Sequence, residues 1–218
     1  MRVMRKSAAI LVCGLVLTGL LCSVSQAYVV PFTIFTENGP YHDGTGVNLY
    51  VDVYDGDGTA KFKFFNASSV DCSITKIFFD DGSLLGIDYV LNDTTLGHTV
   101  LFSKASSGPG DLPGGENLVP PFEAWREFNI GAEPPPSGNG VNNIPTGEWV
   151  EIQFELLSER SLTNVLQELQ TGELRIGLHV QAFPGGSSES AINNPVPEPT
   201  TICLLGLGVL GLLKKRRA

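Results

Sequence analysis

The chain has 218 residues, of which 42% are apolar and 17% charged, with 25 Gly, 14 Pro, three His and two Met. This length allows one sizeable domain or two small ones. This composition argues against haem, iron–sulfur and multi-histidine metal chemistry, and we predict neither a cofactor nor a metal site.

The N-terminus has the three regions of a secretory signal peptide. Three cations in the first six residues precede an uncharged run over residues 8–21, and small residues follow up to Ala27. Because the apolar run is shorter than the roughly 20 residues of a spanning helix, a cleaved signal is favoured over an anchor. We predict a signal peptide over residues 1–27, cut after Ala27. Lipoprotein processing at Cys22 is disfavoured because bulky Leu21 precedes it.

The body between the two ends is acidic and has one cysteine. All 23 acidic residues lie between residues 28 and 199, and with seven cations there they give a net charge of −16. This charge excludes nucleic acid as a partner, keeps an exported domain soluble and is compatible with loose divalent-cation binding. Cys72 is the single cysteine of this part, so no internal disulfide forms and a hydrophobic core must hold the fold.

Short segments rich in β-forming residues predict an all-β body. Residues 48–54 and 60–66 flank the sequence Asp55-Gly56-Asp57-Gly58, which predicts a β-hairpin. Lysine and phenylalanine alternate in the second segment, as in a strand with one solvated face. Further strands are predicted over residues 73–80, 99–103, 149–156 and 174–183.

One helix is predicted between Ser161 and Gly172, because apolar residues recur there at helical spacing between a capping residue and a glycine stop. Residues 106–145 are dense in Gly, Pro and Asn. A long surface loop is favoured there over a domain linker, because neither flank has enough strands for a sandwich. Residues 185–195 are polar and rich in Gly, Ser and Asn, and predict a flexible tether.

Together these elements predict one antiparallel β-sandwich over residues 28–184, with the short helix across an edge or end. A body of residues 28–191 is expected to fold without either terminus and to unfold in one cooperative step. Two transitions would instead indicate a linker between two domains.

The C-terminus has three parts in series. The sequence Pro197-Glu198-Pro199 precedes an apolar run over residues 200–213, which is 14 residues long and spans about 21 Å as a helix. Four cations follow the apolar run, just before the last residue, and they hold this end on the cytoplasmic side of a membrane. They are Lys214, Lys215, Arg216 and Arg217. Lys and Arg side chains that reach up to the membrane surface would extend this short span. Even so, its length suits a temporary stop in the membrane during export better than a lasting anchor.

This order of parts resembles the PEP-CTERM sorting signal of exported bacterial surface proteins, over residues 196–218. The resemblance implies a transmembrane sorting helix that anchors a precursor in the inner membrane. It also implies processing by an exosortase, a membrane-embedded cysteine transpeptidase-like enzyme, and delivery to the cell surface or extracellular matrix. The run departs from the pattern in its shortness, and an ordinary tail anchor is the alternative. Residues 74–81 and 174–190 resemble β-sandwich domains of unknown activity in PEP-CTERM proteins.

The sequence contains no recognisable catalytic or metal-binding pattern. His42, His98 and His179 are far apart with no metal-binding spacing, and no G-x-S-x-G motif is present. Cys72 is interpreted as a small buried side chain, and His179 as a surface or packed side chain rather than a catalytic base. An EF-hand register on the Asp-Gly repeat fails, because apolar side chains would occupy its first and last ligand positions. Tight turns explain the Asp-Gly pairs better than a calcium site. The residues of that calcium alternative are Asp52, Asp55, Asp57, Asp80 and Asp81.

Two further sets of side chains are interpreted structurally. Glu148, Glu151 and Glu155 are expected to mark a solvated face of one strand, because a glycosidase needs two carboxyls across a cleft. Trp125 and Trp149 are expected in the core rather than stacked on sugar rings.

The sequence therefore predicts a non-enzymatic exported surface or matrix protein, associated with exopolysaccharide or a biofilm. The alternative is a secreted hydrolase that acts on extracellular polysaccharide.

Overall fold

The computed structural model describes residues 27–80, 85–131, 138–145, 147–157 and 159–194. The predicted sorting signal, and the predicted signal peptide up to residue 26, lie outside these residues. The elements, in chain order, are β1 (Tyr28–Ile34), β2 (Leu49–Asp55), β3 (Thr59–Asn66), β4 (Ser73–Asp80), β5 (Leu85–Asn92), β6 (Ser103–Lys104), a 3-10 turn (Gly115–Asn117), β7 (Arg126–Asn129), β8 (Val141–Asn142), β9 (Trp149–Leu156), α1 (Leu162–Thr171), β10 (Arg175–Gln181) and β11 (Glu189–Asn193).

The predicted hairpin is formed by β2 and β3. Asp57 and Gly58, at the centre of its turn, both have positive φ angles, of 57° and 90°. This is the backbone of a type I′ turn, whose twist matches that of two paired strands. The Asp-Gly sequence is therefore needed by the turn.

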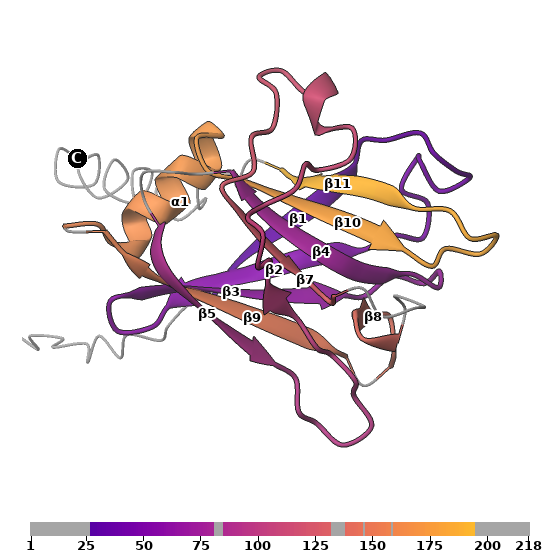
Figure 1. The fold of residues 1–218 in the computed structure, drawn as a ribbon, viewed down its shortest axis with the longest axis horizontal. Coiled ribbons are helices and arrows are strands. Elements are labelled where there is room, and N and C mark those ends of the chain that lie inside the picture. Colours follow the sequence, from indigo (N-terminus) through magenta and orange to yellow (C-terminus); the bar gives the residue numbers. More distant parts are fainter. Residues whose placement is uncertain (1–26, 81–84, 132–137, 146, 158, 195–218) are drawn as a thin grey trace, which may run out of the picture.

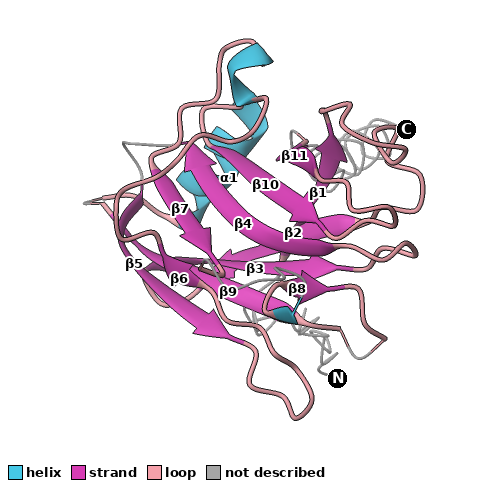
Figure 2. Ribbon diagram, turned by 45° about the vertical axis from the view of Figure 1, so that its right-hand side comes forward, coloured by secondary structure: helices cyan, strands magenta, loops and turns pink. Residues whose placement is uncertain are grey.

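The all-β prediction with one short helix is confirmed, but the strands do not form two separate sheets. All pairs are antiparallel, and one continuous path runs β5-β9-β3-β2-β1-β11-β10-β4-β7-β6, with β8 beside β4. Strand β1 joins the two layers: residues 28–31 pair with β2, and residues 32–34 pair with β11. Figures 1 and 2 show the resulting strongly curved sheet.

The two ends of this path, β5 and β6, approach each other without pairing through their backbones. The carboxylate of Asp88 on β5 accepts from Lys104 on β6 and from Arg126 on β7, the latter at 3.2 Å. Farther along, the side-chain amide of Asn92 exchanges two hydrogen bonds with the backbone of Phe102, at 2.7 and 3.0 Å. Side chains therefore close a sheet that the backbone leaves open.

One hydrophobic core fills the space between the two layers. Phenylalanine rings from both layers meet edge to face at its centre, where Phe79 of β4 contacts Phe62 and Phe154 with centroids 5.2 and 4.8 Å apart. Helix α1 adds Val165 and Leu169 to this core and lies at one end of the strands (Figure 1). Its ends are where the sequence predicts them, because the side-chain oxygen of Asn164 accepts from the backbone and hydroxyl of Ser161, and Gly172 has a φ of 79°.

Residues 106–145 are neither a linker nor only a surface loop. They supply β7 and β8, and they bury Phe128, Ile130 and Val141 in the main core. Leu112 and Phe122 of this segment cover Phe78 in a second, smaller cluster. The Gly- and Pro-rich composition hides these contacts because the apolar residues are widely spaced.

The prediction of a flexible tether over residues 185–195 is wrong. Residues 189–193 form β11, which lies between β1 and β10 in the middle of the sheet (Figure 1). The side chain of Asn193 also accepts from the backbone N–H of Ile176 at 2.7 Å. A body that ends at residue 191 would therefore be cut within a central strand. Strand β11 forms despite its mixed polar and apolar composition, because β1 and β10 satisfy its backbone on both sides.

The remaining strand predictions are mixed. The segments over 73–80, 149–156 and 174–183 are confirmed as β4, β9 and β10, whereas of residues 99–103 only Ser103 lies in a strand. The sequence patterns do not predict strands β1, β5, β7, β8 and β11.

Candidate functional site

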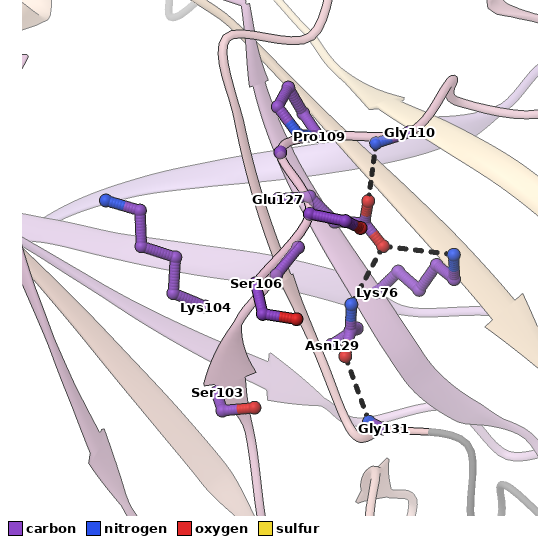
Figure 3. Close-up of a pocket in the computed structure, with 12 residues that line it drawn as sticks. Lys76, Ser103, Lys104, Ser106, Pro109, Gly110, Glu127, Asn129 and Gly131 are labelled. Carbon is purple, nitrogen blue, oxygen red and sulfur yellow. Dashed lines mark hydrogen bonds and ion pairs between the residues drawn. The ribbon is translucent and has the colours of Figure 1, made fainter.

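A polar cavity of about 520 Å³ lies on the outer side of β4, β7 and β6 (Figure 3). Lys76 of β4 and Glu127 of β7 lie on one side of it, and Ser103 and Lys104 of β6 on another. The loop over residues 105–110 completes the lining. The cavity therefore combines two cations, one carboxylate, hydroxyl groups and a glycine-rich backbone.

Glu127 is the organising residue of this cavity. Its side chain accepts from the backbone N–H of Gly110 at 2.7 Å, from the amide of Asn129 at 3.0 Å and from the ammonium of Lys76 at 3.0 Å. Burial would raise the pKa of Glu127, but these donors outweigh it and hold the pKa below its usual value. Glu127 is thus a fixed anion, which suits it to positioning the loop rather than to donating a proton.

A second cavity, of about 530 Å³, lies at the seam between β5 and β7. Asp88, Arg126 and Trp125 line it together with Ile87 and Leu157. The guanidinium carbon of Arg126 is 3.5 Å from the centre of the Trp125 ring, a cation–π contact. Because Arg126 also bonds Asp88, its charge is compensated within the seam.

The structure does not bring the three histidines together. His42 is exposed and bonds the carbonyl of Gly39, whereas His179 lies half-buried beside Lys76. Burial, and to a smaller extent Lys76, lowers the pKa of His179. Its packed position agrees with the prediction.

His98 forms a buried pair with Asp93 that is not among the sequence predictions. The Nδ1 atom of His98 is 2.5 Å from a carboxylate oxygen of Asp93, and both side chains are at most 4% exposed. Burial would raise the pKa of Asp93, but hydrogen bonds from Thr95 and His98 hold it below its usual value. The only sequence signal for this pair is an aspartate five residues before a histidine in a turn-rich segment.

The predicted solvated face of β9 is only partly correct. Glu155 is exposed, but Glu148 and Glu151 are 2% and 6% exposed. Glu148 accepts from the backbone and amide of Asn142, and Glu151 accepts from the hydroxyl of Tyr54. Polar partners from other strands bury these carboxylates, which strand alternation alone does not reveal.

The tryptophans and the cysteine occupy different environments. Trp125 is half-buried and packs against the core, whereas Trp149 is half-buried on the outer face, so the core prediction fails for Trp149. Cys72 is a buried free thiol, as predicted, and burial raises its pKa.

Of the residues of the calcium alternative, Asp81 lies outside the described ranges, and the other four do not converge on one site. No group of three or more His, Cys, Asp or Glu within the described ranges is arranged to hold a metal ion. Asp80 bonds Arg175 instead, and Asp57 occupies the hairpin turn.

Residues 195–217 match the PEP-CTERM protein-sorting motif. The chain carries a PEP-CTERM sorting signal. The match covers the three residues of the predicted motif, Pro197, Glu198 and Pro199, and the four cations at 214–217. It implies an exported, membrane-passing precursor that an exosortase processes.

No curated protein and no solved structure matches the chain. Among the residues that the structure describes, no helix has the length and apolar content needed to cross a membrane. The predicted sorting helix, and its motif and cations, lie outside those residues.

Proposed function

We propose that this PEP-CTERM protein is a non-enzymatic component of the cell surface or extracellular matrix, in contact with exopolysaccharide. The observation that carries the proposal is the sorting motif at residues 195–217. An exosortase removes the end of the chain in this proposal, and the acidic body stays outside the cell.

The fold supports this proposal because the body and the sorting motif are directly adjacent. Strand β11 ends at Asn193, and the backbone of Asn194 still bonds the carbonyl of Pro31 at 2.9 Å. Pro197 lies four positions after Asn193, which lets them lie at most about 14 Å apart. The processing enzyme would therefore act beside a folded body.

The described cavities support a role without catalysis. Each of the three cavities characterised within the described residues contains one acidic side chain: Glu127, Asp88 or Glu148. Each of these carboxylates is engaged by donors from the protein. A glycosidase uses two carboxyls across one cleft.

Cell fractionation tests the sorting part of the proposal. In cells with the processing enzyme we expect a shortened, extracellular form, and in cells without it a membrane-bound full-length form. Replacing Pro197, Glu198 and Pro199 by alanine should reproduce the second pattern. Replacing Pro40, Pro113 and Glu123 by alanine, all three exposed, provides a matched triple variant within the body. A full-length form that persists in both cells would identify a tail anchor and overturn the proposal.

Incubating the purified protein with neutral and acidic polysaccharides tests the absence of catalysis. We expect no new reducing ends. Release of reducing ends that Glu127→Gln, Asp88→Asn or Glu148→Gln abolishes would establish a hydrolase instead.

A further inference from the structure

The outer face of β2, β3, β9 and β5 gathers large amphipathic side chains. Of the seven Tyr and Trp residues in the chain, four lie on this face. They are Tyr50, Tyr54, Tyr89 and Trp149. Tyr and Trp dominate recognition surfaces because one side chain offers a large apolar area with a polar tip.

The strand register arranges these residues in rows. Tyr50, Phe65 and Trp149 are direct neighbours across β2, β3 and β9. The rings of Tyr50 and Phe65 stack with centroids 5.0 Å apart. At about 4.8 Å between strands, the row is about 10 Å long. A second row contains Tyr54 and, at the edge, Tyr89, which is 51% exposed.

Hydrogen-bonding groups lie between the two aromatic rows. Asp52, Lys63 and Glu151 are neighbours across the same three strands. One carboxylate oxygen of Asp52 is shielded from solvent and has no hydrogen-bond partner in the structure. Burial raises the pKa of Asp52, and Lys63 partly offsets this effect. A buried acceptor without a donor is costly, and Asp52 as a whole is only half-buried, so a rotation of its carboxylate toward a ligand hydroxyl would relieve this cost.

A cavity of about 410 Å³ continues the first aromatic row. Tyr50 and Phe65 form one side of it, and Asn143 and Pro145 line it as well. The amide of Asn143 makes two long hydrogen bonds of 3.4 Å, to Cys72 and Ser68, which are weak enough to exchange for a ligand. The cavity thus joins an aromatic surface to amide donors and acceptors.

The charge of this face is nearly balanced, although the body carries −16. Lys61 and Lys63 offset most of the charge of Asp52, Glu151 and Glu155. The ammonium of Lys63 also lies 3.9 Å from the centre of the Trp149 ring, and that of Lys61 lies 5.9 Å from the centre of the Tyr54 ring. These cation–π contacts hold both lysines on the face and leave their N–H groups available to a ligand. Such a face suits an uncharged polymer, whereas the surrounding negative field repels an acidic one.

We propose that this outer face binds a neutral polysaccharide. Sugar rings combine apolar C–H groups with peripheral hydroxyls, and the face offers aromatic carbon beside Asp52, Lys63 and Asn143. The C–H groups contact the aromatic rows, and the hydroxyls donate to Asp52 and accept from Lys63 and Asn143. This inference deepens the proposed function and rests on it, because the ligand is an extracellular polymer.

Affinity electrophoresis of the full chain in detergent tests the inference. The native gel contains hydroxyethyl cellulose, dextran or galactomannan as neutral probes, or polygalacturonate as the acidic one. We expect at least one neutral polymer to retard the protein, and polygalacturonate to have no effect. Tyr89→Ala and Trp149→Ala should each weaken retardation by about tenfold, as removal of a central aromatic contact does.

Trp125→Ala is the matched control, because Trp125 lies at the seam and not on this face. It should bind like the unaltered protein. Tyr89 is exposed at an edge, so Tyr89→Ala should fold even if Trp149→Ala does not. Absence of retardation by every neutral polymer, retardation by polygalacturonate alone, or equal losses in the control would overturn the inference. A change of oligomeric state in size-exclusion chromatography of Tyr89→Ala or Trp149→Ala would also overturn it, because it would indicate that this face binds a protein partner. A failure here with normal sorting in the fractionation experiment would leave the export proposal standing.

Discussion

The carboxylate of Glu127 should stabilise the protein mainly through its fixed neutral donors rather than through its ion pair. Glu127 is 4% exposed and accepts from Gly110, Asn129 and Lys76. In Glu127→Gln one oxygen becomes an NH₂ group, so at least one donor loses its acceptor. A buried donor without an acceptor costs about 1–3 kcal/mol, and we expect a loss of about 2 kcal/mol in the free energy of unfolding.

The ion pair should contribute much less, because 42% of the Lys76 side chain is exposed. Solvent screening limits such a pair to about 0.5 kcal/mol, so Lys76→Met should change stability little. Denaturant unfolding followed by tryptophan fluorescence measures both changes. In thermal unfolding, Glu127→Gln should lower Tm by about 6 °C, at about 2–4 °C per kcal/mol for a domain of this size.

Glu123→Gln is the control, since Glu123 is an exposed glutamate near the same strand. It should leave stability unchanged. The reasoning is refuted if Lys76→Met costs as much as Glu127→Gln, because the ion pair would then dominate. It is also refuted if Glu127→Gln and Glu123→Gln have the same stability.

Three further predictions concern packing, the last strand and pH. A Cβ atom at Gly140 would lie 2.5 Å from a backbone carbonyl of β4, so Gly140→Ala should cost about 1–3 kcal/mol in denaturant unfolding, whereas Gly138→Ala, with open space around it, should be neutral. A chain ending at Ala191 should lose its cooperative thermal transition, and one ending at Asn194 should keep it; equal behaviour would contradict the role of β11. The pKa of Glu127 is lower in the folded protein than its value of about 4.3 in the unfolded chain, so ionised Glu127 stabilises the fold above that pH. This stabilisation is lost as the pH falls through the pKa of the folded protein. The difference in stability between the unaltered protein and Glu127→Gln should therefore close in acid titrations.

The sequence determined the local elements whose causes are themselves local. The Asp57-Gly58 turn needs positive φ angles, and Ser161 and Gly172 bound a helix whose apolar stripe is visible in the sequence. The sorting signal was also readable, because its three parts act in linear order and need no fold.

Only the tertiary structure decided how distant segments share strands and faces. Residues 189–193 look like a linker, and they become a central strand because β1 and β10 satisfy both of their edges. Glu148 and Glu151 are expected on a solvated face, but they are buried against donors from β8 and β2. The row of Tyr50, Phe65 and Trp149 is set by a register that joins residues up to 99 positions apart. Long-range pairing carries no local pattern, since the partner of a strand depends on the path of the whole sheet.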